Sequence, residues 1–320
     1  MRYENIDFLK GICIMLVVAN HLSLPGFTIA SLSLFRMPLY YFLSGLFFSR
    51  YDSFFTFLIK KTNNLIVPYV FFSLFSLFPF FAFYLFKDRT VEEAYYLSRP
   101  LHNEPIWFLV SLYEVGLIMY FVSGIRKLYL QCVLVLFLSV CGYILCKKSL
   151  NLPFYLNTAL CGIVFYYIGF ILRHYYKLLD NNDNIKIKFL MCSVFFGVLS
   201  IYIIPGKGIS LITCQIQTSY HWFVLAGVGG TLALFYLSKI VEKVKIVNYI
   251  GRYSIIVLGT HWYFVKSWKY FIIPPPNIGF FLYLIFAVSI LSSLISIAIL
   301  KRYMPWFTAQ KPLISLSDKK

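Results

Sequence analysis

Seven stretches of this chain run for 18 or more residues without a single Asp, Glu, Lys or Arg. A helix that crosses a bilayer needs about 17–25 apolar residues, so each stretch is long enough to be a membrane span. The seven stretches are 11–35, 62–86, 128–146, 149–172, 189–206, 208–238 and 270–300. Three less regular apolar segments are also candidates, namely 37–49, 105–125 (interrupted by Glu114) and 253–265.

Together these segments predict an all-α, polytopic integral membrane protein with about ten transmembrane helices. Only 13% of the residues are charged, whereas an average soluble domain is about a quarter charged. The chain lacks the polar material to cover a soluble domain, so we expect residues 1–320 to form a single transmembrane domain. The predicted spans are 7–24, 36–50, 65–86, 106–125, 128–146, 155–173, 188–205, 221–239, 250–268 and 278–300.

The distribution of Lys and Arg predicts the orientation of these spans. With the N-terminus in the cytoplasm, the cytoplasmic connections hold 20 Lys and Arg residues and the outer ones hold 9. This bias predicts that both termini are cytoplasmic. The net charge of +17 then reflects topology and contact with anionic lipid, and we expect no nucleic-acid partner.

The first span carries a polar stripe. Lys10 and His21 are 11 residues apart, which is about three helical turns, or roughly 16 Å along one face. Asp7 precedes Lys10 by three residues and lies on the same stripe. An imidazole at this depth is expected to face a polar cavity or the bundle interior. The alternative is that His21 is interfacial and that Asp7 and Lys10 only mark the inner boundary.

Several segments resemble the membrane acyltransferase 3 family, and specifically its fucose 4-O-acetylase-like branch. Lys10 and His21 match the family pattern of a basic residue, ten residues and then His. The remaining similar segments are Ile6–Gly11, Phe35–Gly45, Pro105–Leu109 and Gly251–Ser254 followed by His261. Many relatives carry Arg-x-x-Arg-x-x-Pro at the start of the third span. Here the matching stretch is Lys61–Pro68, in which Lys61 keeps the charge and Asn64 replaces the second Arg.

The resemblance implies transfer of an acyl group, usually acetyl, from cytosolic acyl-coenzyme A to a sugar hydroxyl of a cell-surface or lipid-linked glycan. It also implies a location in the bacterial cytoplasmic membrane. His21 is the expected general base, with a transient acyl-histidine as the other possibility. Arg36 is a candidate to stabilise the oxyanion. Four basic residues are candidates to bind the phosphates of acetyl-coenzyme A: Lys10, Lys60, Lys61 and Arg126.

Three further residues are weaker candidates for the substrate cavity. Glu114 interrupts the fourth span and either pairs with a cation or lines the cavity. His261 lies in the ninth span, where an interfacial position beside Trp262 is the alternative. Glu104 lies at the predicted outer mouth, where it either contacts a glycan or is simply solvated.

Two other function classes remain possible from the sequence. A ten-helix protein with buried charges could export a glycan without forming a bond, although we find no pair of matching interrupted helices. A structural membrane subunit would not need the polar stripe. No metal site is predicted, and the seven cysteines, none in CxxC spacing, are expected to be small core residues without disulfides.

Overall fold

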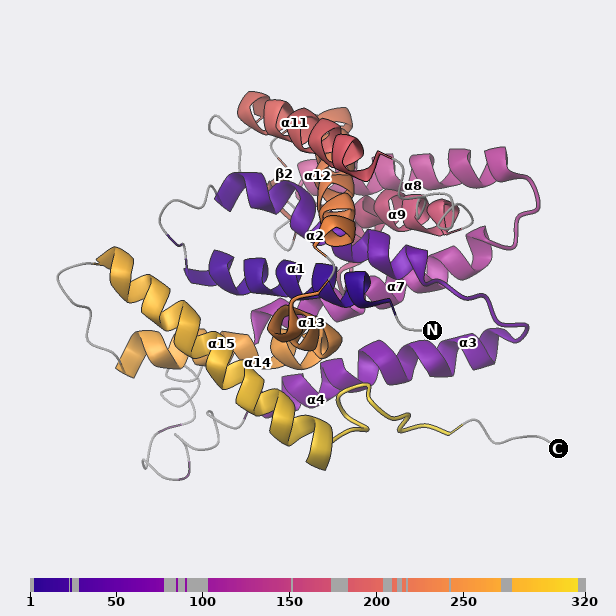
Figure 1. Cartoon of the computed structure of the whole chain (residues 1–320). Coiled ribbons are helices and arrows are strands. Elements are labelled where there is room, and N and C mark those ends of the chain that lie inside the picture. Colours follow the sequence, from indigo (N-terminus) through magenta and orange to yellow (C-terminus); the bar gives the residue numbers. More distant parts are fainter. Residues whose placement is uncertain are drawn as a thin grey trace. The chain divides into compact units, whose positions relative to one another are not determined.

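The computed structural model describes most of the chain as helices (Figure 1). Its residues form two compact units, each of which is described by itself. The first unit comprises 1–16, 28–57 and 111–252, and the second comprises 17–27, 58–110 and 253–320. The described residues are 3–22, 24, 29–77, 85, 90, 103–150, 152–173, 184–203, 209–211, 215–216, 218–241, 243–271 and 278–315.

Among the described residues the predicted all-helical class is confirmed, apart from one hairpin of two-residue strands. Three helices contribute residues to both units: α1 (Glu4–Leu22), α3 (Phe54–Lys61) and α7 (Trp107–Val122). The first unit adds α2 (Ile29–Leu46), α8 (Leu128–Lys147), α9 (Leu156–Leu172), α11 (Ile185–Ile203), β1 (Ile209–Ser210), β2 (Gln215–Ile216), α12 (Tyr220–Ile240) and α13 (Lys245–Arg252). The second unit adds η1 (Thr62–Ile66), α4 (Val67–Phe75), η3 (Glu104–Ile106), α14 (Ser254–Phe271) and α15 (Ile278–Tyr303).

Helix α9 is the central element of the first unit, and most of its residues are buried. It packs against α2, α8 and α12. Gly45 of α2 faces the carbonyl of Tyr166, and Gly169 of α9 faces the carbonyl of Phe42. A Cβ at either glycine would overlap the opposite backbone. These two glycines therefore permit a close approach of α2 and α9, as small residues do in membrane helix pairs.

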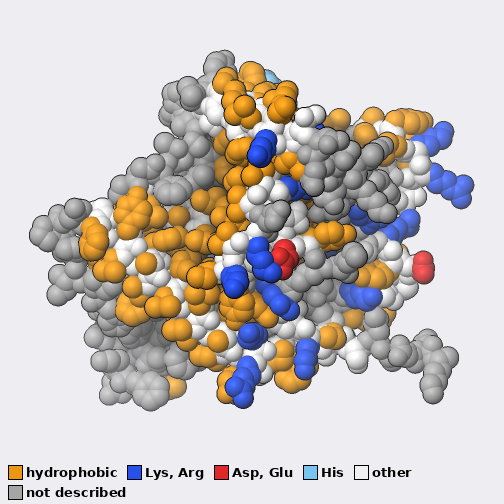
Figure 2. All heavy atoms as spheres, in the orientation of Figure 1, with side chains coloured by type: hydrophobic (Ala, Val, Ile, Leu, Met, Phe, Trp, Pro, Cys, Tyr) orange, Lys and Arg blue, Asp and Glu red, His pale blue; other side chains and the backbone are white. Residues whose placement is uncertain are grey.

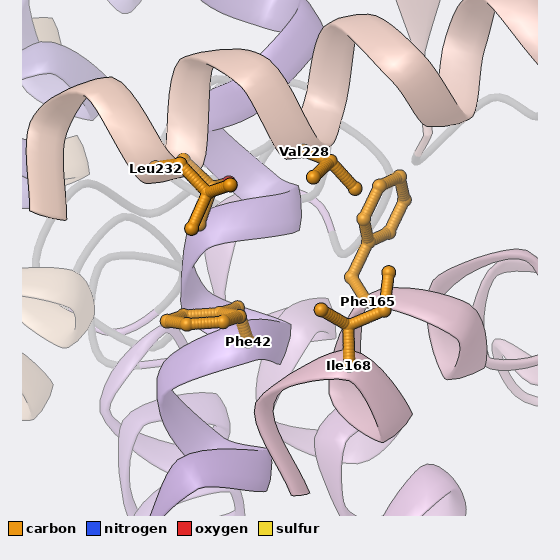
Figure 3. Close-up of a pocket in the computed structure, with 6 residues that line it drawn as sticks. Phe42, Phe165, Ile168, Val228 and Leu232 are labelled. Carbon is orange, nitrogen blue, oxygen red and sulfur yellow. The ribbon is translucent and has the colours of Figure 1, made fainter. Parts of the chain in front are cut away.

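A small void remains in this core between α2, α9 and α12 (Figure 3). Its volume is about 10 Å³, and its lining includes Phe42, Phe165 and Leu232. Thr231 also lines it, and the hydroxyl of Thr231 is buried without a partner among the described residues. A water molecule needs about this much room but also two to four polar partners. We therefore interpret the void as a packing defect rather than a ligand site.

Several helices expose apolar faces that require lipid as solvent. Leu136 and Phe137 of α8 are more than half exposed, as are Leu291 and Ile295 of α15. Figure 2 shows broad areas of hydrophobic side chains on one face of the molecule. Among the described residues, five helices are long and apolar enough to cross a membrane. They are Glu4–Leu22, Glu104–Val122, Leu128–Lys147, Tyr220–Ile240 and Gly279–Tyr303.

The second unit is built around α14, which packs against α4, η3 and α15. The segment after α15 folds back onto η1 and α4. Phe307 stacks on Phe71 of α4 with ring centroids 5.3 Å apart. Asn63, in the π-helical turn η1, is 4% exposed and accepts hydrogen bonds from the backbone N–H groups of Leu313 and Ile314, each at 2.9 Å. Its amide also donates to the carbonyl of Ile314 at 2.9 Å.

Some helix boundaries differ from the predicted spans. The span predicted at 36–50 is α2, which begins at Ile29 and ends at Leu46. The span predicted at 250–268 is interrupted at Tyr253, because α13 ends at Arg252 and α14 begins at Ser254. The span predicted at 65–86 extends beyond residue 77, where only residue 85 is described.

The prediction that no cysteine forms a disulfide is wrong for Cys146, which is disulfide-bonded. The prediction relied on the absence of CxxC spacing. Disulfide formation depends instead on how closely the fold brings two Cα atoms together, and spacing along the chain does not report that distance.

Candidate functional site

Two histidines that the sequence predicted as separate candidates meet in the second unit. His21 lies in the last turn of α1, and His261 lies in the middle of α14. Their ring centroids are 5.4 Å apart, with the ring planes inclined by 36°. His21 is partly exposed, whereas His261 is completely buried. His261 therefore lies in the protein interior, and the two imidazoles form one cluster.

The hydrogen bonding of His261 fixes its protonation pattern. Its Nδ1 lies 2.8 Å from the carbonyl oxygen of Val257, one helical turn earlier. A carbonyl can only accept, so Nδ1 must carry the hydrogen, and in the neutral ring Nε2 then holds the lone pair. Nε2 is buried and has no hydrogen-bond partner among the described residues. A buried acceptor without a partner is unusual and marks a candidate site for a ligand or a proton.

Trp262 and Lys266 belong to the same cluster, although the sequence analysis did not select them. Trp262 meets the ring of His21 edge-on, with centroids 4.9 Å apart. The ammonium group of Lys266 lies 4.5 Å from the centre of the Trp262 ring, within cation–π range. The sequence spacing could have indicated that Lys266 contacts Trp262, because Lys266 lies one helical turn after Trp262. The cluster therefore combines two imidazoles, an indole and a nearby cation.

Polar side chains from η3 and α4 fix α14 beside the cluster. Asn103 donates a hydrogen bond to the carbonyl of Gly259 at 2.7 Å, and its side-chain oxygen is buried without a partner among the described residues. The hydroxyl of Tyr263 donates to Ser76 at 2.6 Å. Glu104, the predicted glycan contact, follows Asn103 and is exposed. These bonds hold the segment of α14 that carries His261 in a defined position.

Arg36 lies in the first unit, against the middle of α1. Its Nη1 donates to the carbonyl of Leu16 at 3.5 Å, and its own carbonyl accepts a hydrogen bond from the thiol of Cys13 at 3.2 Å. Its Nε is buried and has no partner among the described residues. A guanidinium group with an unused, buried N–H can bind an anion.

Lys10 and Asp7 lie on α1, the helix that also carries Cys13 and Leu16, the hydrogen-bond partners of Arg36. The Lys10 ammonium lies 5.8 Å from the centre of the Phe47 ring, and its carbonyl accepts a hydrogen bond from Tyr40 at 3.3 Å. The carbonyl of Asp7 faces Gly251 of α13 so closely that a Cβ there would overlap it. α1 runs without interruption from Glu4 to Leu22, so the predicted stripe belongs to one continuous helix.

The two motif glycines near this stripe have a packing role. Gly11 of α1 faces the carbonyl of Val247, and Gly251 of α13 faces the carbonyl of Asp7. Any side chain at either position would overlap the opposite backbone. The segments Ile6–Gly11 and Gly251–Ser254 therefore form the two sides of one close helix contact.

Glu114 and Arg126 lie elsewhere in the first unit. The Glu114 carboxylate accepts a hydrogen bond from the backbone N–H of Tyr155. Its Oε2 is buried without a partner among the described residues. The predicted ion pair of Glu114 is thus not observed in the part of the chain that the structure describes. Arg126 is exposed in the connection between α7 and α8.

The predicted donor-binding lysines lie at the end of α3. Lys60 is exposed, whereas Lys61 is partly buried, and burial lowers the pKa of Lys61 to about 8. Asn64, which replaces the family arginine, is exposed. Its neighbour Asn63 is the buried residue that holds the C-terminal segment. No sequence pattern indicated a role for Asn63, which lies in the π-helical turn and is buried.

The fold and this cluster define a multi-pass membrane protein in which two histidine rings are in contact. The chain matches the acyltransferase domain of the acyltransferase 3 family over residues 3–300 and belongs to that family. It is therefore a membrane enzyme of a family that transfers acyl groups. No curated protein and no solved structure shows significant similarity to the chain.

Proposed function

We propose that this protein transfers an acetyl group from cytosolic acetyl-coenzyme A to a hydroxyl of a cell-surface or lipid-linked glycan. The observation that carries the proposal is the contact between His21 and His261 in a chain of the acyltransferase family. An imidazole can take a proton from a sugar hydroxyl near neutral pH, which the transfer requires. We place the protein in the fucose 4-O-acetylase-like branch of the family and in the bacterial cytoplasmic membrane.

In the proposed reaction His21 is the general base. It takes the proton of the sugar hydroxyl while the hydroxyl oxygen forms a bond to the thioester carbon. The carbon–sulfur bond then breaks, and the sulfur takes that proton and leaves as the free thiol. The ring of His261, whose Nδ1–H donates to the Val257 carbonyl, lies beside His21 and so limits the orientations that His21 can adopt.

Arg36 is the proposed partner of the oxyanion that forms at the thioester carbon. The buried Nε of Arg36 has no other partner among the described residues, which supports this role. Lys10, Lys60, Lys61 and Arg126 are the proposed contacts of the donor phosphates. Lys supplies a point charge for a phosphate, without the two-pronged geometry of Arg.

The proposed topology has ten spans and both termini in the cytoplasm. Two features of the first unit support it. Tyr143 near the end of α8 donates to the carbonyl of Thr218, and Thr158 at the start of α9 donates to the carbonyl of Leu211. These contacts gather three segments that the topology assigns to the outer side. The disulfide-bonded Cys146 lies on the same side, where an oxidising compartment permits disulfides.

Two experiments test the proposal. Membranes that contain the protein should transfer radiolabel from labelled acetyl-coenzyme A to a glycan, and a deletion strain should lack the corresponding mass on its surface glycan. Unchanged glycan mass with lost glycan export would instead indicate a transporter. For the topology, single cysteines are introduced at positions 88 and 319 and treated with a thiol reagent. The cysteine at 88 should be labelled from outside intact cells, whereas the cysteine at 319 should be labelled only after permeabilisation. Labelling of position 319 in intact cells would contradict the proposed orientation.

A further inference from the structure

The first unit contains a cavity of about 240 Å³ that none of the predicted donor contacts lines. Its lining comes from three segments: Tyr3 before α1, the end of α2 with the residues that follow, and Arg173 after α9. The residues at the end of α2 are Leu46, Phe47, Phe48 and Ser49. In the proposed topology all three segments lie on the cytoplasmic side, where the acyl donor is present.

Arg173 supplies a positive charge to this cavity. Its guanidinium group donates a hydrogen bond to the carbonyl of Phe48 and lies 5.7 Å from the centre of the Phe170 ring. Among the described residues no carboxylate forms an ion pair with it. Glu4, one of two acidic residues on the first turn of α1, pairs with Lys243 at 2.7 Å instead. The charge of Arg173 is therefore not neutralised within the described part of the chain.

Aromatic rings line the same cavity as Arg173, and a second cation lies beside one of these rings. The rings of Tyr3 and Phe47 have centroids 6.2 Å apart, and the ammonium group of Lys10 lies 5.8 Å from the centre of the Phe47 ring. The exposed Ser49 adds a hydroxyl to the lining. Guanidinium, ammonium and hydroxyl groups are the usual partners of phosphate oxygens, and aromatic rings stack on planar bases.

We infer that this cavity binds the phosphate-bearing nucleotide end of coenzyme A, with Arg173 as the principal phosphate contact. The inference rests on the proposed function and adds a donor-binding residue to it. Pockets for whole drug-sized ligands have volumes of about 300–1,000 Å³, so 240 Å³ suits only one end of coenzyme A.

A phosphate group could also come from an anionic lipid, so the test must separate these sources. The full chain is reconstituted in nanodiscs of phosphatidylcholine, and the affinities of coenzyme A, 3′-dephospho-coenzyme A and pantetheine are measured by calorimetry. Arg173→Gln should weaken coenzyme A binding about tenfold or more, because charge-assisted bonds to phosphate are lost. Pantetheine, which has no phosphate, should bind both proteins equally.

Two further variants keep the test independent of folding. Ser49→Trp should fill the cavity and weaken coenzyme A binding without removing a contact of Arg173. Arg302→Gln is the matched control, because Arg302 is an exposed arginine at the end of α15 and does not line the cavity. The affinity of this variant for coenzyme A should equal that of the wild type. Thermal unfolding of each variant shows whether it is folded.

The possible results distinguish an error in the assignment of the cavity from an error in the proposed function. If the wild type binds coenzyme A and both Arg173→Gln and Ser49→Trp bind it equally well, the inference about the cavity is wrong and the donor assignment stands. If the variants lose only co-purified phosphatidylglycerol, the cavity is a lipid site and the inference is overturned. If the wild type binds no coenzyme A, the proposed donor is wrong, and the inference fails with it.

Discussion

Replacing Asn63 by Ala should release the C-terminal segment from the second unit. Asn63 makes three hydrogen bonds of 2.9 Å to the backbone of residues 313 and 314. A typical hydrogen bond within a protein contributes about 0.5–1.5 kcal/mol, so the three together should contribute about 1.5–4.5 kcal/mol to the attachment of the segment. The local opening equilibrium should therefore rise about 10- to 1,600-fold, since about 1.4 kcal/mol corresponds to a factor of ten.

Hydrogen exchange of the Leu313 and Ile314 amides measures this opening directly. Both N–H groups are bonded to Asn63 in the wild type, so their protection should fall in Asn63→Ala. Asn63→Asp should have an intermediate effect, because a carboxylate can still accept both N–H bonds but cannot donate to the Ile314 carbonyl. The matched control is Asn64→Ala, which changes an exposed neighbour of the same residue type.

Equal protection of the two amides in Asn63→Ala and in the wild type would refute the reasoning. Such a result would mean that the packing of Phe307 on Phe71 alone holds the segment. Equal loss of protection in Asn63→Ala and Asn64→Ala would also refute it, because the effect would then come from the π-helical turn as a whole.

Three further predictions concern packing, catalysis and pH. Gly169→Ala should destabilise the protein by about 1–3 kcal/mol, because the new Cβ would overlap the Phe42 carbonyl. The control Gly197→Ala should not be destabilising, because Gly197 has open space around it. Thermal unfolding in detergent compares the two variants. His21→Ala should reduce acetyl transfer at saturating donor about 10²- to 10⁴-fold, whereas Lys10→Ala should chiefly raise KM for acetyl-coenzyme A; near-normal turnover of His21→Ala would exclude His21 as the base. If Lys61 binds a donor phosphate, kcat/KM should decline above about pH 8, because the ammonium group of Lys61 loses its proton. Lys61→Arg should remove that decline, since a guanidinium group stays charged. If the pH profile of Lys61→Arg equals that of the wild type, Lys61 does not have this role.

The sequence predicted the class of fold well because lipid imposes a simple rule on composition. Every backbone polar group in a bilayer must be bonded within the protein, so long stretches without charge indicate helices. The positions of helix ends were less predictable. The break at Tyr253 directly follows Arg252, at the edge of an apolar stretch, and no Pro marks it, so the sequence predicts one span that includes this charge.

The candidate site was predicted in part. The spacing of Lys10 and His21 identified a polar face of α1, and His261 was identified from its resemblance to a family element. The contact between His21 and His261 depends on tertiary packing, which helical periodicity does not report. Arg173 was counted only as one of many cytoplasmic basic residues, because nothing in the sequence indicates that it lies beside Phe48. Trp262 and Lys266 were missed because aromatic and basic residues are common at the ends of membrane helices.

The π-helical turn at Thr62–Ile66 also affects how this chain should be compared with its relatives. A π turn closes its hydrogen bonds from i to i+5, one residue more than an α turn, and so takes up an inserted residue without breaking the helix. The family pattern Arg-x-x-Arg-x-x-Pro places its proline six residues after the first basic residue, whereas Pro68 follows Lys61 by seven. The π turn accommodates this extra residue, and an alignment should place a one-residue gap within Thr62–Ile66. The absence of the second arginine in this chain therefore coincides with an extra residue before Pro68.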